Sequence, residues 1–275
     1  NIWVNESANI GFGHVRLAIV DIDTGTQPMS LEDGTTIAFN GEIYNYIELQ
    51  RELGIDNFKT ASDTEVILHA YKRWGQDCVN HFRGMFAFVI WDAQKKETFF
   101  ARDRFGIKPL YIMNFVNGDI YLGSEVKAFL PFLKRKEIDE GSLSDYFSFQ
   151  FILGENSLLK NVRQIMPAHR GLIDSNNKIK TSKYWDVNYD LDYGHSEEYF
   201  IDNIKHLIED SARLHMRADV EVGAYVSGGL DSSLLAQIGS TLRSEDKVSF
   251  KAFNGKFNEG SKFDESKYAR DLANE

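Results

Sequence analysis

The stretch Ser227-Gly228-Gly229-Leu230-Asp231-Ser232-Ser233 decides how the second half of the chain must fold. It follows a strand-like apolar run, 220–226, and opens an amphipathic helical pattern, 234–242. A strand, a Gly-Gly turn and a helix start leave several backbone N–H groups unpaired near one point, where the positive end of the helix dipole adds to them. The glycines also let a ligand approach the backbone closely. The stretch therefore predicts a phosphate or pyrophosphate site.

The side chains of this turn fit the same interpretation. Ser227, Ser232 and Ser233 supply hydroxyl donors. Asp231 repels a phosphate, so we expect it to hold a hard cation such as Mg2+ that bridges to the phosphates. The chain lacks the Gly-Lys-Ser/Thr ending of the Walker-type phosphate loop. The alternative interpretation is a plain helix N-terminus that Ser or Asp caps.

The segments around the turn alternate between helical and strand-like patterns. We predict helices over 196–217, 231–242 and 264–275, with strands over 220–226 and 248–253. Such alternation is typical of a parallel sheet with crossover helices. An acidic, tyrosine-rich stretch, 185–195, precedes these segments, and we place a domain linker there.

The part of the chain before the linker has a different pattern. Ser62 and Glu65 form a capping box that starts a helix over 63–74, and a second helix is predicted over 44–53. The run 85–91 is apolar throughout, as in a strand that is covered on both faces. These features predict two stacked sheets covered by helices. Further expected elements are strands over 11–20 and 36–39, an antiparallel meander over 97–102, 109–115 and 120–123, a helix capped by Ser142, and a hairpin over 169–184.

Composition narrows the function classes. The chain has 275 residues, 43% hydrophobic content and a formal net charge of -10, which favours a packed two-domain protein and argues against a nucleic-acid partner. It has no long apolar run, which argues against a membrane span or secretion. Cys78 is the single cysteine, so no intrachain disulfide can form, and a cytoplasmic setting fits. We expect Cys78 to be a buried structural thiol. The ends, at Asn1 and within a helical pattern at Glu275, predict a fragment of a longer protein.

Several sequence strings carry a resemblance to a known family. The 227–233 stretch resembles the SGGxDS loop of ATP pyrophosphatases, which activate a carboxylate or carbonyl by adenylation and release pyrophosphate. Five further strings resemble the glutaminase domain of the glutamine-hydrolysing asparagine synthetase B family. They are 13–21 (GHVRLAIVD), 39–45 (FNGEIYN), 62–66 (SDTEV), 84–88 (GMFAF) and 102–111 (RDRFGIKPLY). In that family the glutaminase domain precedes the synthetase domain, and this chain has the same order.

The resemblance implies a fold and a reaction. Residues 1–185 are expected to form an α+β N-terminal-nucleophile hydrolase sandwich, α-β-β-α, without its N-terminal segment. Residues 196–275 are expected to begin an α/β parallel-sheet ATP pyrophosphatase domain. The implied reaction adenylates the β-carboxylate of aspartate with ATP and Mg2+. Ammonia from glutamine then gives asparagine, AMP, pyrophosphate and glutamate. The implied enzyme is cytoplasmic and a homodimer.

The resemblance also implies a glutamine site in the first domain. Arg16 is expected to hold the α-carboxylate of glutamine, in a bidentate pairing that lysine cannot copy. Asp63 is expected to pair with the ammonium group, although an acid is also favoured at a helix start for its own sake. The backbone carbonyls of Leu17 and Val20 lie beside them in this arrangement, and Glu42 lines the same pocket.

An oxyanion hole is implied next to that pocket. The side chain of Asn40 and the backbone N–H of Gly41 are expected to stabilise the charge that develops on the amide oxygen. The alternative for this pair is a tight turn at the end of a strand. We expect His14 to be structural.

Nucleotide contacts are implied on both strands of the second domain. Tyr225 and Val226, on the strand that enters the loop, and Ala252, on the next strand, are expected to contact adenine and ribose. The predicted ATP site therefore comprises Tyr225, Val226, Ser227, Gly228, Gly229, Leu230, Asp231, Ser232, Ser233 and Ala252, with Asp231 on the metal. Asp264 and Glu265 are interpreted as a helix cap.

One departure from the family keeps other functions open. The family's nucleophile is a cysteine at the mature N-terminus, and Cys78 matches no catalytic position. Without that nucleophile, the protein would use free ammonia or catalyse a cyclisation like that of β-lactam synthetases. Two rivals remain: an amidotransferase for another carboxylate, such as a sugar acid, and a regulatory protein that binds nucleotide or glutamine without turnover.

Overall fold

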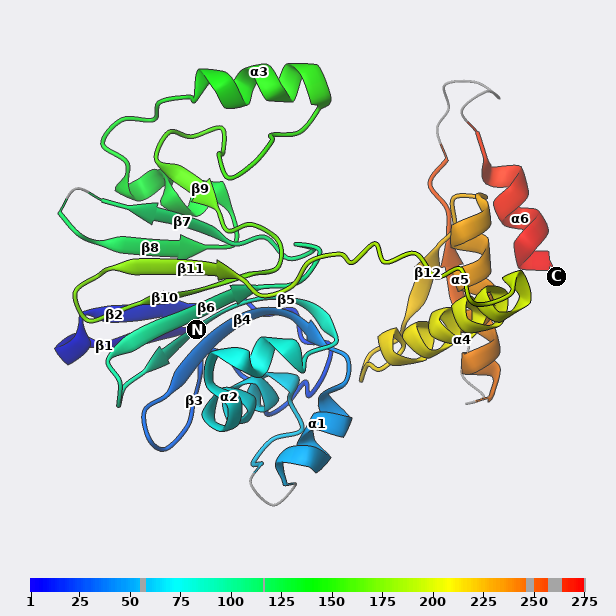
Figure 1. Cartoon of the computed structure of the whole chain (residues 1–275), viewed down its shortest axis with the longest axis horizontal. Coiled ribbons are helices and arrows are strands. Elements are labelled where there is room, and N and C mark those ends of the chain that lie inside the picture. The colour runs from blue at the N-terminus through cyan, green and yellow to red at the C-terminus, as the bar shows by residue number, and fades with distance from the viewer. Residues whose placement is uncertain (55–57, 116, 246–249, 257–263, 275) are drawn as a thin grey trace. The chain divides into compact units, whose positions relative to one another are not determined.

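The computed structural model describes residues 1–54, 58–115, 117–245, 250–256 and 264–274. Its contacts divide the chain into two compact units, Asn1–Asn188 and Tyr189–Glu275 (Figure 1). The two units are built from different kinds of sheet. In the described parts of both, no helix combines the length and the apolar character that a membrane span requires.

A six-stranded antiparallel sheet forms the centre of the first unit. Its strand order is β11-β10-β6-β5-β4-β3. Strand β5 lies inside this sheet and is buried along most of its length, as its continuous apolar run predicts. The strands are β3 (Met29–Ser30), β4 (Thr36–Ile43), β5 (Gly84–Asp92), β6 (Glu97–Arg102), β10 (His169–Ile173) and β11 (Ile179–Lys183).

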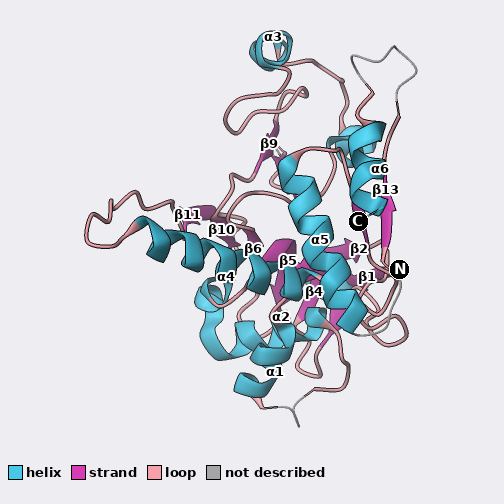
Figure 2. Ribbon diagram, turned by 90° about the vertical axis from the view of Figure 1, so that its right-hand side faces the viewer, coloured by secondary structure: helices cyan, strands magenta, loops and turns pink. Residues whose placement is uncertain are grey.

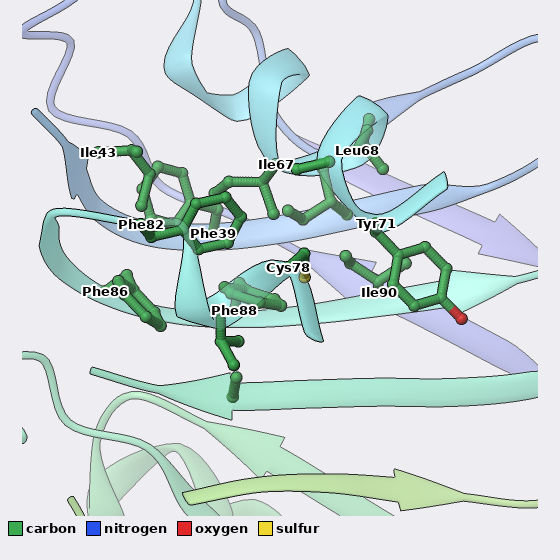
Figure 3. Packing of buried hydrophobic residues seen from close by; sticks show 14 of the residues in the cluster. Phe39, Ile43, Ile67, Leu68, Tyr71, Cys78, Phe82, Phe86, Phe88 and Ile90 are labelled. Atoms are coloured by element: carbon green, nitrogen blue, oxygen red, sulfur yellow. The ribbon is translucent and has the colours of Figure 1, made fainter. Parts of the chain in front are cut away.

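Two helices cover one face of this sheet. Figures 1 and 2 both show α1 (Tyr46–Leu53) and α2 (Asp63–Trp74) on the same side of β4, β5 and β6. The apolar face of α2 packs on aromatic residues of β5 (Figure 3). Cys78, in the 3-10 helix η3 (Gly75–Asn80), is buried in this core, and burial raises the pKa of its thiol. The expectation of a buried structural thiol is thus confirmed.

Smaller sheets cover the other face of the central sheet. Strand β1 (Ile2–Asn5) pairs with β2 (Ile10–Gly13), and η1 (Glu6–Ala8) connects them. A second small sheet has the order β8-β7-β9. Its strands are β7 (Tyr111–Asn114), β8 (Ile120–Gly123) and β9 (Val162–Gln164).

An apolar core joins these layers. Side chains of the central sheet and of the smaller sheets pack together around Val89, Phe100 and Ile165. On the β7 sheet, the 3-10 helix η4 (Val126–Phe132) contributes the buried Phe129. The first unit therefore has the helix–sheet–sheet–helix order of the expected α-β-β-α sandwich.

Four local predictions were wrong, and tertiary contacts explain three of them. The expected strand 11–20 ends at Gly13, because the following loop folds back through hydrogen bonds of its own side chains. Strand β4 does not end at residue 39 but continues to Ile43. The expected meander divides, since β6 pairs with β10 whereas β7 joins another sheet. Helix α3 (Glu140–Phe149) is capped by Asp139, whose side chain accepts the N–H of Ser142.

The second unit has the predicted alternation. Strands β12 (Gly223–Tyr225) and β13 (Lys251–Phe253) pair in parallel, and Val226, Ala236 and Ala269 form a small buried core. The helices are α4 (Glu197–His215), α5 (Leu230–Glu245) and α6 (Ser266–Asn274). The predicted segments at 248–249 and 275 lie outside the described residues.

Candidate functional site

The first candidate site is built on the last residues of β4. Phe39 and Ile43 belong to the core beneath α2, so the side chains of Asn40 and Glu42 project from the opposite face of the strand. Gly41 has a φ of 148°, and a Cβ added to it would lie 2.1 Å from the carbonyl oxygen of Met85. Only glycine therefore permits this close approach of β4 to β5. The interpretation of Asn40-Gly41 as a turn is wrong, because the pair lies within a strand.

On the edge of β4 that faces away from β5, the backbone N–H of Gly41 has no partner among the described residues. Opposite Gly41 in the register, Phe86 directs both its N–H and its C=O to Asp103. By antiparallel alternation, the N–H of Gly41 then points away from β5. On the same edge, Phe39 donates its N–H to Gln27 Oε1 (2.7 Å) and Ile43 donates its N–H to Asp63 Oδ2 (2.9 Å). The N–H of Gly41 lies between these two satisfied groups, where an oxyanion could accept it.

Arg16 approaches the same region, and its hydrogen bonds go to backbone carbonyls. Its Nη2 donates to the carbonyl oxygens of Val20 (2.5 Å) and Asp21 (3.0 Å), and its Nη1 donates to Asp21 O (3.1 Å). These acceptors are neutral, and Arg16 forms no ion pair in the described part of the chain. Gly25 leaves room for the guanidinium, because a Cβ there would lie 2.6 Å from Nη2. The carbonyl of Val20, expected beside the substrate, is thus already occupied by Arg16, and the side chain of Leu17 is exposed.

Three carboxyl groups lie within electrostatic range of Arg16, those of Asp21, Glu42 and Asp63, and the last two lie at the β4 end of the region. Asp63, at the first position of α2, is buried, and burial raises its pKa although Arg16 opposes the rise. Burial also raises the pKa of Glu42, and the charge of Asp63 raises it further, whereas Lys108 and Arg16 lower it. A guanidinium beside two carboxyl groups suits an amino-acid zwitterion, with its carboxylate on Arg16 and its ammonium on the acids.

Two residues near this site were not predicted. Ser124, which directly follows β8, accepts a long hydrogen bond of 3.5 Å from Asn40 Nδ2. Lys108 acts electrostatically on Glu42 and lies in the 102–111 string, to which sequence analysis assigned no role. The signal for Lys108 was available, because it is the lysine of that string. No sequence signal pointed to Ser124. We call Arg16, Asn40, Gly41, Glu42 and Asp63 the β4 site.

The second candidate site is the turn between β12 and α5, residues 227–233, which we call the Gly228 turn. Ser227 donates its N–H to Ser232 Oγ (3.2 Å), and Gly229 donates its N–H to Ser227 Oγ (3.3 Å). Hydroxyls of the turn therefore satisfy two of its amides. The N–H groups of Gly228, Leu230, Asp231 and Ser232 have no partner among the residues that the structure describes. Four amides at the N-terminus of α5 therefore remain for an anion.

The beginning of α6 fixes the shape of this turn. Gly228 has a φ of 91°, and a Cβ added to it would lie 2.9 Å from Tyr268 Cβ and 3.1 Å from Glu265 O. The side chain of Asp264 accepts the N–H of Ser266 (3.0 Å) and pairs with Lys256, contacts that lower its pKa to about 2. These contacts support the interpretation of Asp264 as a helix cap.

The remaining predicted nucleotide contacts, Tyr225, Val226 and Ala252, lie on or next to strands β12 and β13, and their side chains do not share one face. Tyr225 is opposite Phe253 in the register, whereas Ala252 is opposite Ala224, so the side chains of Tyr225 and Ala252 lie on opposite faces. Tyr225 is 87% exposed. Val226 is buried, donates its N–H to Phe253 O and accepts from Asn254 Nδ2. The structure thus gathers residues 227–233 but does not bring Ala252 to the side chain of Tyr225.

Comparison with known proteins gives matches to both units. Residues 1–185 match a family described as a glutamine amidotransferase domain, and residues 203–275 match a family described as asparagine synthase. The chain is similar to glutamine-hydrolysing asparagine synthetase 1 of Bacillus subtilis, with 40% identity over 233 residues, which cover 84% of this chain and 37% of that protein. It is 36% identical over 279 residues to asparagine synthetase 3 of the same organism, covering 96% and 43%.

Two further matches complete the comparison. Amidase chry2 of Gibberella zeae is 33% identical over 288 residues, which cover 98% of this chain and 42% of that protein. The solved structure of a Bacillus subtilis glutamine phosphoribosylpyrophosphate amidotransferase, complexed with ADP and GMP, matches with a TM-score of 0.43 and 21% identity. That match covers 91% of this chain and 53% of the other. The chain spans about two fifths of the length of the curated relatives.

Proposed function

The chain belongs to the glutamine amidotransferase family over residues 1–185, and from this premise we propose a glutamine-dependent asparagine synthetase. In this proposal, residues 1–185 form the domain that releases ammonia from glutamine. Residues 196–275 belong to the domain that activates the β-carboxylate of aspartate with ATP. The products are asparagine, AMP, pyrophosphate and glutamate. The similarity to two asparagine synthetases supports this assignment.

The β4 site supports the glutamine half of the reaction. The guanidinium of Arg16 binds the α-carboxylate of glutamine, and Asp63 and Glu42 bind its ammonium group. The amide oxygen is then directed to the N–H of Gly41 and to Nδ2 of Asn40, which stabilise the tetrahedral intermediate. Cys78 is buried beneath α2 and does not supply the nucleophile. In this proposal the nucleophile is a cysteine other than Cys78.

The Gly228 turn supports the nucleotide half. Its four open N–H groups, together with the dipole of α5, bind the phosphates that leave as pyrophosphate. In the described residues no cluster of three or more His, Cys, Asp or Glu could hold a metal by itself. A single carboxylate nevertheless suits Mg2+, which keeps several waters and takes its other ligands from phosphates. Asp231 would hold that ion, which neutralises charge on the leaving group.

The open N–H of Gly41, held beside Arg16 and two raised-pKa carboxyl groups, is the observation that carries the proposal. The test uses the full-length protein with glutamine, ATP and Mg2+. We expect glutamate to form from glutamine, and AMP and pyrophosphate to form only when aspartate is present. An enzyme that hydrolyses glutamine but forms no aspartate-dependent AMP would contradict the aspartate assignment.

A second acceptor class has support from one comparison. The similar protein from Gibberella zeae is named an amidase, over nearly the whole of this chain. An amidotransferase that acts on another carboxylate would share the β4 site and the Gly228 turn. Screening AMP formation against aspartate, sugar acids and β-amino acids with the full-length protein separates the two candidates.

A further inference from the structure

The loop that follows β2 turns at a buried acidic residue, Asp21. It is 9% exposed, and its φ of 52° is a left-handed conformation that glycine, asparagine and aspartate adopt most readily. The residue ends the 13–21 string, and the proposed reaction does not use it. Because a charged side chain is rarely buried without partners, its contacts indicate what it does.

The backbone of Asp21 holds the guanidinium of Arg16. The carbonyl oxygen of Asp21 accepts hydrogen bonds from Nη1 (3.1 Å) and Nη2 (3.0 Å), and the carbonyl of Val20 accepts a further bond from Nη2. Gly25 donates its N–H to the same carbonyl of Asp21 (3.2 Å), which fixes the acceptor within the turn. These bonds engage only part of the N–H donors of the guanidinium, and the rest remain for a substrate carboxylate.

The carboxylate of Asp21 reaches the helix that carries the other charged end of the β4 site. Its Oδ2 accepts the N–H of Ala61 (3.0 Å), which lies 40 residues further along the chain. Ala61 directly precedes Ser62, the N-cap of α2, and Asp63 is the first residue of that helix. One residue therefore bonds to Arg16 through its backbone and to the start of α2 through its side chain.

The loop and the start of α2 are also closely packed. A Cβ added to Gly25 would lie 2.6 Å from Arg16 Nη2 and 2.9 Å from Ser62 Oγ. Asp63 is fixed on its far side as well, because its Oδ2 accepts the N–H of Ile43 in β4. The bond from Ala61 to Asp21 thus spans a tight junction between two segments that are distant in sequence.

Thr24 holds the carboxylate of Asp21 in this position. It donates its N–H to Oδ1 (3.0 Å) and its hydroxyl to Oδ2 (2.6 Å). Burial favours a raised pKa for Asp21, but the bonds from Thr24 and Ala61 and the charge of Arg16 lower the pKa below its usual value. The group is therefore a carboxylate at neutral pH, and a carboxylate accepts stronger hydrogen bonds than a neutral side chain does.

We propose that Asp21 is a positioning residue of the β4 site, which sets the spacing between Arg16 and Asp63 and so matches it to the α-carboxylate and α-ammonium of one amino acid. The inference rests on the proposed glutaminase function. A substrate that carries both charges gains from both groups only when their spacing is correct. A substrate that carries one of the charges depends far less on that spacing.

The test compares glutamine with glutaramate, which has the carboxylate and the amide of glutamine but no ammonium, in the full-length protein. Asp21→Ala should raise KM for glutamine about tenfold, the scale of one hydrogen bond to a charged group, with little change in kcat. The inhibition constant of glutaramate against glutamine hydrolysis should rise about threefold at most. A partial loss of folded enzyme would instead lower the maximal rate and leave both constants unchanged.

Three variants of the loop locate the effect. Asp21→Gly keeps the left-handed backbone without the carboxylate and should behave like Asp21→Ala; recovery of the wild-type KM would overturn the role of the carboxylate. Asp21→Asn keeps one acceptor oxygen and should lie between the two. Asp23→Ala, at an exposed position of the same loop, is the matched control and should behave as wild type.

The remaining outcomes separate this inference from the proposed function. If wild type does not hydrolyse glutamine, the proposed function fails. If it does, and Asp21→Ala is active with unchanged constants for both compounds, only the role of Asp21 is overturned. If Asp21→Ala does not fold, Thr24→Val decides, because Thr24 is exposed and this variant removes one bond to the carboxylate. Its KM for glutamine should rise about threefold, and an unchanged KM would contradict the inference.

Discussion

The β4 site and the Gly228 turn differ in where their geometry comes from. The β4 site joins residues of a loop, a strand and a helix, and buried side chains such as Asp63, Asp103 and Gln27 fix its backbone. The Gly228 turn is a local strand-to-helix connection whose own hydroxyls accept two of its amide N–H groups. The first site therefore joins residues from distant parts of its unit, whereas the second consists of seven consecutive residues that pack against the start of α6.

This difference sets what a substitution should do in each place. In the β4 site, a substitution that enlarges a residue disturbs the packing of the sheet, so stability and activity should be lost together. In the Gly228 turn, exposed side chains can change without disturbing a core, so activity should fall while the fold remains. Each of the following experiments measures folding and one half-reaction in the full-length protein.

Gly41→Ala should have the largest effect. The added Cβ would lie 2.1 Å from Met85 O and 2.8 Å from Phe86 Cα, and both are backbone atoms that cannot move aside. We expect a loss of at least ~3 kcal/mol in the free energy of unfolding, together with loss of glutaminase activity. Urea unfolding and glutamate release measure the two effects. Gly13→Ala is the control, because a Cβ there meets nothing within 4 Å; equal stability of the two variants would show that the close approach is unimportant.

Asp231→Asn should come second and should separate the two sites. Asp231 lies at the start of α5, and its loss removes the proposed metal ligand without disturbing a core. We expect aspartate-dependent pyrophosphate release to fall about 100-fold, the scale of removing metal stabilisation of a leaving group. Glutaminase activity and the unfolding midpoint should stay as in wild type. Asp271→Asn, on α6, provides the control, and a comparable fall in that variant would remove the special role of Asp231.

The same difference explains what the sequence could predict. Helix α2 and strand β5 follow from local signals, a capping serine and an unbroken apolar run. Ser62 Oγ does accept the N–H of Thr64, although Glu65 bonds to the N–H groups of Lys59 and Thr60 instead of closing the box on Ser62. The strand-turn-helix of residues 220–242 is local in the same way, and its alternation with parallel pairing is confirmed.

Features of the β4 site that depend on distant partners escaped prediction. Asn40-Gly41 has the composition of a turn, and only the close pairing with β5 shows that the strand continues through it. The site residues themselves came from a family resemblance, and their roles remain proposals. Ser124 carries no local signal of its position beside Asn40, because that position follows from the sheet that contains β8.

Glu42→Gln should change stability in a direction opposite to its effect on binding. Burial and Asp63 raise the folded-state pKa of Glu42 above its usual 4.5, so ionisation of this group costs stability increasingly as pH rises above that value. The glutamine variant avoids this cost. We expect equal stability of the two proteins near pH 4.5 and, at pH 8.5, an advantage of the variant on the order of 1 kcal/mol after solvent screening.

Chemical unfolding at both pH values measures the difference, and glutamine KM is measured in parallel. The stability advantage should appear only at the higher pH, and KM for glutamine should also rise mainly there, where Glu42 is ionised in the wild type. Glu140→Gln, at the exposed start of α3, is the control and should show no growing advantage. A variant that is less stable than wild type at pH 8.5 would mean that ionised Glu42 stabilises the fold. The β4 site would then not be a place where a charge costs folding stability.

Ser232→Ala should have the smallest effect, since the hydroxyl of Ser232 is already engaged within the turn. The hydroxyl of Ser232 accepts the N–H of Ser227 and donates to Gly229 O (3.1 Å), so a phosphate can recruit it only by breaking that bond. The net gain from such an exchange is well below that of a free donor, and we expect ATP affinity to fall about threefold. Calorimetric titration with ATP and Mg2+ measures the change. Ser240→Ala, farther along α5, is the control. A loss of more than about 100-fold would show that the hydroxyl is a principal phosphate ligand, and the Gly228 turn would then depend on a side chain more than on its backbone amides.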